Sequence, residues 1–156
     1  MVKEKFQDII ENDGVLGGLI ISSAGLISLF FGGIIVVILY LLNSTYTELF
    51  EFVLFGIPFG ASASFIAGFL TWKYLHTYGN KAKGLVGSVF AIVLSSILFN
   101  LGLYISDGFF IGLEEVIMLF MTVVITIMFG LFTVGWIYIP TSILLADYIG
   151  QKEIKN

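Results

Sequence analysis

Few side chains in this sequence are of the kinds that carry acid–base, metal or nucleophilic chemistry. The chain has a single histidine, His76, and neither cysteine nor arginine. An H-E-x-x-H zinc site needs two histidines on one helix, and a thiolate nucleophile or a disulfide needs cysteine. The composition therefore predicts a protein that is not an enzyme and that holds no metal and no cofactor.

The adjacent carboxylates Glu114 and Glu115 come nearest to a catalytic pair. They resemble the paired glutamates of some membrane proteases, but those families also use an arginine shortly afterwards and histidines in other helices, which this chain lacks. A solvated acidic loop is the simpler interpretation, with weak attraction of cations as the alternative. His76, between Lys73 and Tyr78, is interpreted as a solvated loop histidine.

The elements that would position any site are long apolar segments. The chain is 58% hydrophobic and 12% charged, about half the charged fraction of a soluble domain. About 20 apolar residues cross the ~30 Å hydrocarbon core of a bilayer. Charges are absent from four stretches that are each long enough, residues 14–47, 52–72, 84–106 and 116–146. We expect an all-α, polytopic membrane protein, a bundle of four transmembrane helices at about 15–42, 52–74, 84–105 and 116–139, within a transmembrane domain over residues 14–149.

The lysines predict the orientation of these spans. All seven positive charges fall on one side of a four-span topology, at Lys3, Lys5, Lys73, Lys81, Lys83, Lys152 and Lys155. The opposite loops, 43–51 and 106–115, carry only acidic charges. The positive-inside rule then places both termini, including a tail over 150–156, on the cytoplasmic side of the cell membrane. A three-span or five-span topology would break this segregation.

The N-terminal region predicts a surface helix followed by a retained span. Apolar residues at helical spacing within residues 1–13 indicate an amphipathic helix lying on the inner membrane surface; a helix that docks on a partner is the alternative. The apolar run over 15–42 exceeds the ~7–15 residues of a secretory signal core, and no small-residue cleavage pattern follows it.

Small residues recur on one face of each expected span. Gly56, Gly60, Ser64 and Gly68 lie four residues apart on the second span, and such spacing keeps them on one helix face. Similar series occur on the other spans: Gly18, Ser22, Gly25 and Gly32 on the first, Gly87, Ala91, Ser95 and Gly102 on the third, and Thr122, Thr126, Gly130 and Thr133 on the fourth. Small residues let helix backbones approach closely in a membrane. We expect tight packing on these faces, within one chain or between chains, and disruption of packing by Gly60→Leu.

The two prolines predict irregular helix geometry. Pro58 lies inside the second span and is expected to kink it. A straight helix over 116–146 would be ~46 Å long, so we expect Pro140 to interrupt it and residues 141–149 to form a kinked extension or an interfacial piece. A weak repeat, Gly-Val-Leu-Gly at 14–17 and Gly-Leu-Val-Gly at 84–87, leaves a two-plus-two duplication open.

Every aspartate, glutamate and lysine and the single histidine lie at a boundary of the expected spans or in a loop, which argues against ion-coupled transport. Asn100 is the most polar intramembrane residue, and Asn100, Ser95, Thr122 and Thr126 are the candidates for a polar lining. One hypothesis is a non-enzymatic homo-oligomer that provides a passive pore for a small solute. The alternative is an accessory or assembly subunit of a larger membrane complex. The expected partners are the lipid bilayer and either a second copy or another membrane protein, with no nucleic acid.

Overall fold

The computed structural model describes residues 13–42, 47–106 and 113–153. Apart from a short link over 75–79, all of these residues are helical. The prediction of an all-α fold is therefore confirmed. The amphipathic helix expected over residues 1–13 lies outside the described residues, except for Asp13, which begins the first described helix.

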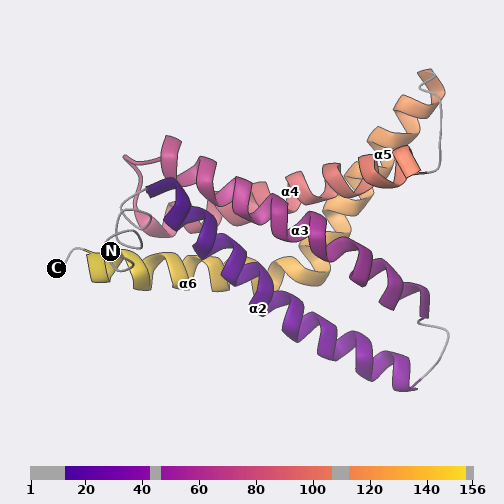
Figure 1. Cartoon of the computed structure of the whole chain (residues 1–156), viewed down its shortest axis with the longest axis horizontal. Coiled ribbons are helices and arrows are strands. Elements are labelled where there is room, and N and C mark those ends of the chain that lie inside the picture. Colours follow the sequence, from indigo (N-terminus) through magenta and orange to yellow (C-terminus); the bar gives the residue numbers. More distant parts are fainter. Residues whose placement is uncertain (1–12, 43–46, 107–112, 154–156) are drawn as a thin grey trace, which may run out of the picture.

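The helices follow one another along the chain in the order shown in Figure 1. They are α2 (Asp13–Leu42), α3 (Thr47–Tyr74), α4 (Asn80–Ser106), α5 (Leu113–Gly130), the π-helical segment η2 (Leu131–Gly135) and α6 (Trp136–Glu153). Three segments of the described chain are long and apolar enough to cross a membrane, Gly14–Phe31, Asn80–Ile105 and Glu114–Ile149. A helical membrane protein is thus supported, while the count of four spans stays a prediction.

Several helices extend beyond the expected spans, into charged segments that the sequence predicted to be loops. α3 begins at Thr47 rather than 52, α4 begins at Asn80 rather than 84, and α6 continues to Glu153, into the expected tail. Glutamate and lysine are good helix formers, so a helix can extend past an apolar segment that is long enough to cross a bilayer. The charge boundaries therefore mark the limits of the apolar spans and not the limits of the helices.

Four helices form a closed ring. α2 packs on α3 and α6, and α4 also packs on α3 and α6. The beginnings of α2 and α4 and the ends of α3 and α6 lie at the same end of the molecule (Figure 1), which we call the lysine end because Lys73, Lys81 and Lys83 lie there. The buried core of the ring consists of Leu16, Ile20, Ile21, Ala24, Ala67, Trp72, Ala91, Ile92, Tyr138 and Ala146.

α5 leaves this ring. Among the described residues it packs on α4 and on the adjoining η2, but on neither α2 nor α3. In Figure 1 α5 projects away from the far ends of α2 and α3. Large apolar side chains are exposed along it, including Met118, Phe120, Met121 and Ile125. The bundle is therefore closed at the lysine end and open at the opposite end.

The long helix over 113–153 changes geometry before its proline. Regular α-helix gives way to a π-helical turn at Leu131–Gly135, and α6 then continues through Pro140 to Glu153. The ring of Pro140 conflicts with the carbonyl of Trp136, four residues earlier, and leaves that carbonyl without its usual donor. The π-helical turn ends directly before Trp136. The irregularity therefore precedes Pro140, the residue at which the sequence predicted an interruption of the helix. α3 likewise continues through Pro58 as one helix.

Candidate functional site

The closest contact in the bundle is the crossing of α2 and α3 at two glycines. A Cβ added at Gly17 would lie 2.5 Å from the carbonyl oxygen of Gly68 and 2.5 Å from the ring of Trp72. A Cβ added at Gly68 would in turn overlap the carbonyl oxygen of Gly17. The two backbones therefore touch, and no side chain larger than hydrogen fits at either position without a shift of the helices.

The same crossing continues along α2. A Cβ at Gly18 would lie 2.9 Å from the ring of Phe65, and one at Gly25 would lie 3.3 Å from Ser64 Oγ. Gly18, Gly25, Ser64 and Gly68, each singled out by the sequence pattern, thus meet in one contact between α2 and α3. This is the close approach that small residues permit in membrane helices.

α4 makes three further contacts through glycine. A Cβ at Gly84 would lie 2.7 Å from the carbonyl oxygen of Ser142, so α4 and α6 also approach backbone to backbone. A Cβ at Gly87 would lie 3.0 Å from Ile21 Cδ1, and one at Gly102 would lie 2.7 Å from the ring of Phe59. The sequence pattern did not mark Gly17 or Gly84 as packing residues. Both belong to the Gly-x-x-Gly repeats at 14–17 and 84–87, and this repeat is the signal that could have found them.

Gly60 differs from the other members of its series. Among the described residues, no atom lies within 4 Å of the position that its Cβ would occupy, apart from its own helix backbone and chain neighbours. Gly60 therefore packs against no other described helix. A leucine at this position would meet none of them, so the described structure does not support the expectation that Gly60→Leu disrupts packing within the chain. Gly32 and Gly56 lie within α2 and α3, and their surroundings lie outside the described side chains.

A buried tyrosine joins three helices of the ring. Tyr138, in α6, is 3% exposed. Its hydroxyl donates to Ser64 Oγ at 3.0 Å and lies 3.4 Å from the carbonyl oxygen of Ile21. It links α6 to α3 and to α2 where Gly25 lets α2 approach Ser64. The sequence offered no signal for this residue, because one tyrosine in an apolar helix also fits an interfacial position.

The four candidates for a polar lining do not converge. Asn100 Nδ2 donates to Thr126 Oγ1 at 3.1 Å, which links α4 to α5, and to the carbonyl of Ser96 at 2.8 Å. Ser95 Oγ donates to a carbonyl of its own helix, and Thr122 Oγ1 is exposed and does the same. Two of the four therefore form a contact between helices, and the other two donate hydrogen bonds to backbone carbonyls of their own helices.

Most of the remaining interior hydroxyls are also satisfied locally. Each donates to a carbonyl three or four residues earlier, as hydroxyls in helices often do; they are Ser28, Thr71, Ser88, Ser96 and Ser142. A shallow surface depression on α4 is lined only by apolar side chains, Leu85, Val86, Val89, Phe90 and Val93. Over the described residues, no three histidine, aspartate or glutamate side chains gather as metal ligands. His76 and Glu114 are exposed.

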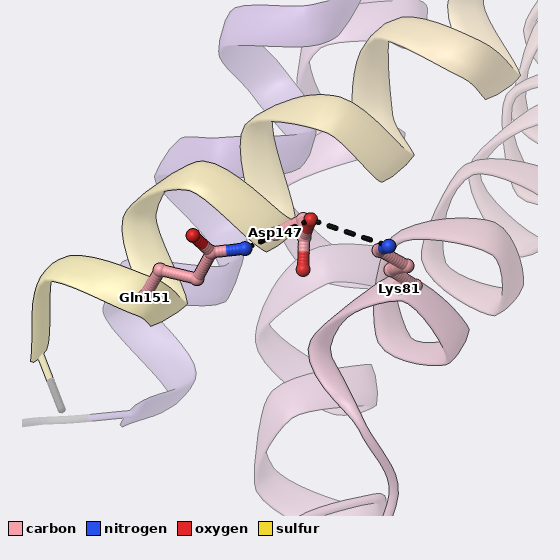
Figure 2. Close-up of polar contacts among 3 residues, drawn as sticks. All are labelled: Lys81, Asp147 and Gln151. Carbon is pink, nitrogen blue, oxygen red and sulfur yellow. Dashed lines mark hydrogen bonds and ion pairs between the residues drawn. The ribbon is translucent and has the colours of Figure 1, made fainter.

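The lysine end holds the charged contacts of the described chain. Lys81 Nζ pairs with Asp147 at 3.4 Å, and Gln151 Nε2 donates a hydrogen bond to the same carboxylate at 3.2 Å. The carboxylate of Asp147, in α6, is therefore contacted from two sides (Figure 2). Lys83 is buried, and its Nζ lies 5.7 Å from the centroid of the Trp72 ring. This geometry binds α4 to both of its neighbours in the ring.

Comparison of the chain with protein-family models, with curated proteins and with solved structures finds no match.

Proposed function

We propose that the chain is a non-enzymatic integral membrane protein that crosses the cell membrane four times, with both termini in the cytoplasm. Three segments have the length and hydropathy of spans, and α3 runs antiparallel between two of them over 28 residues. The lysine end, where four helix ends meet, would then face the cytoplasm, in agreement with the positive-inside rule.

We further propose that this protein works as a homo-oligomer in which α5 contacts a second copy. The observation that carries this proposal is the position of α5, which among the described residues packs on one helix of the ring and on the adjoining η2, and which exposes large apolar side chains. On α5 the side chain of Ile125 is 65% exposed. A second copy would cover this face with protein and complete the open end of the bundle.

Such an assembly would provide the passive path for a small solute. Thr122 is exposed on α5, and Thr126 on the same helix is joined to Asn100 of α4. These polar side chains belong to α5 or are hydrogen-bonded to it, so a path between copies would be lined there. The single chain does not bring the four lining candidates together, and the oligomer is therefore an essential part of this proposal.

An accessory or assembly subunit is the second candidate, and the open position at Gly60 favours it. Gly60 belongs to a series of small residues, yet no described atom outside its own helix backbone and chain neighbours lies within 4 Å of its Cβ position. A helix of another membrane protein could approach α3 closely at this point.

Cysteine cross-linking tests the proposed role of α5, because the natural chain has no cysteine. Ile125→Cys places a thiol on α5, and Leu26→Cys places one on α2 with a similar exposure, 59% against 65%. After oxidation in native membranes we expect Ile125→Cys to form a disulfide dimer of twice the chain mass and Leu26→Cys to remain monomeric.

Equal dimer yields from the two variants, or none from Ile125→Cys, would contradict the homo-oligomer. If native mass spectrometry of the gently solubilised protein then shows a monomer, or a complex with a different chain, the accessory-subunit function replaces it.

A further inference from the structure

Lys83 is buried to an extent that is unusual for lysine. It lies in the first turn of α4 and is 9% exposed as a whole residue; the long apolar stem of a lysine is often buried while its ammonium reaches the surface. Its Nζ lies over the ring of Trp72, itself 4% exposed. The face of an aromatic ring attracts a cation, but it does not neutralise the charge.

No described carboxylate supplies the missing counter-charge. The one ion pair in the described part of the chain joins Lys81 to Asp147, and Asp147 also receives the amide of Gln151 (Figure 2). Lys83 Nζ is not among the enclosed side-chain atoms that lack a hydrogen-bond partner, so its ammonium stays accessible to an anion. Lys83 also stands in the first turn of a helix, where the amide dipoles add positive potential. The site is therefore suited to an anion from outside the described residues.

An apolar surface continues from Lys83 along α4. Val86, Phe90 and Val93 follow Lys83 by 3, 7 and 10 residues, a spacing that places all four on the same side of a helix. These three residues line the shallow apolar depression on α4, together with Leu85 and Val89. A ligand with a phosphate head and a hydrocarbon chain matches this order of charge and apolar surface.

We propose that Lys83 and this depression bind an anionic phospholipid, with the lipid phosphate at Lys83 Nζ and one acyl chain along Val86, Phe90 and Val93. Lys73, which follows Trp72 in the sequence and whose Nζ lies 5.7 Å from the Phe69 ring centroid and 5.8 Å from that of Tyr74, adds positive charge at the lysine end. The site requires neither the homo-oligomer nor the passive path.

Tryptophan fluorescence tests the site, because Trp72 lies against Lys83. The chain has two tryptophans, so Trp136→Phe, away from the lysine end, leaves Trp72 as the single reporter. The purified variant in neutral detergent is titrated with phosphatidylglycerol, with phosphatidylcholine and with inorganic phosphate. We expect a saturable change in Trp72 emission with phosphatidylglycerol and none at the same concentrations with the other two.

Two lysine substitutions on the Trp136→Phe background separate this site from general surface attraction. Lys83→Gln removes a charge-assisted contact and should weaken phosphatidylglycerol binding at least about tenfold. Lys81→Gln is the matched control two residues away: its side chain is 70% exposed and paired, so its loss should weaken binding by less than about fivefold. Lys83→Arg, which keeps the charge, should retain binding within about fivefold.

Three results would overturn the proposal. Equal losses for Lys83→Gln and Lys81→Gln would reduce the effect to diffuse attraction. Inorganic phosphate that competes at the concentrations at which the lipid binds would assign the site to a free anion. If Lys83→Gln fails to fold, lipid selectivity of the wild-type chain remains decisive: native mass spectrometry that finds phosphatidylglycerol and phosphatidylcholine retained equally would overturn the site.

Discussion

At the scale of single residues, two glycines of one series have opposite surroundings. Gly68 touches the backbone of α2, whereas Gly60, two turns earlier in α3, has open space at its Cβ position. Spacing of four identifies a helix face, but helices cross at an angle, and only the part of that face near the crossing touches its neighbour. The sequence could therefore predict the face and could not predict which of its members are in contact.

This difference predicts opposite results for one substitution at the two positions. Gly68→Leu places a side chain into the backbone of Gly17 and should destabilise the bundle by at least about 1–3 kcal/mol, the usual cost of overpacking. Gly60→Leu should leave the stability of the isolated chain within about 0.5 kcal/mol, as surface substitutions do. Unfolding of both variants in the same detergent measures the difference.

Equal destabilisation by the two leucines would contradict the α2–α3 crossing described here. Loss of an oligomer by Gly60→Leu, with chain stability unchanged, would instead place Gly60 in a contact between chains.

At the scale of the helices, the sequence predicted the elements better than their contacts. The apolar stretches predicted the existence of every described helix, whereas helix ends differ by several residues because charged side chains extend the helices. The separation of α5 from the ring was not predictable, since the stretch 116–146 reads as one continuous apolar segment. The π-helical turn at Leu131–Gly135 divides that stretch, so that α6 completes the ring and α5 does not.

The hydrogen bond between Asn100 and Thr126 predicts energetic coupling between α4 and α5. Asn100→Ala, Thr126→Val and the double variant form a double-mutant cycle that isolates this pair. Interhelical hydrogen bonds in membranes average about 0.6 kcal/mol and reach about 1.7 kcal/mol, and we expect a coupling in that range from unfolding in detergent. As a control, Thr122→Val with Asn100→Ala should show no coupling, because Thr122 donates to the carbonyl of Met118 in its own helix. Additive effects of the first pair would show that α5 is not held to α4 in this way.

At the scale of the whole molecule, the chain is a pair of helical hairpins that close into a ring at one end. The segregation of lysines predicted that the beginning of α2, the ends of α3 and α6 and the beginning of α4 share a side, and these four helix ends lie together in the structure. Charge patterning is informative at this scale because a loop cannot change sides without moving a whole helix. It carries no information on packing inside the bundle, where Tyr138 and the paired glycines act.

The most direct test of the central claim, a four-span protein with its lysine end in the cytoplasm, is cysteine labelling of single-cysteine variants in intact cells. Asn43→Cys and Asp107→Cys place thiols in the two acidic loops, while His76→Cys and Gln151→Cys place them at the lysine end. We predict that a membrane-impermeant maleimide labels the first two variants in intact cells and labels the last two only after the membrane is opened. Labelling of all four in intact cells, or of one variant from each pair, would contradict the account.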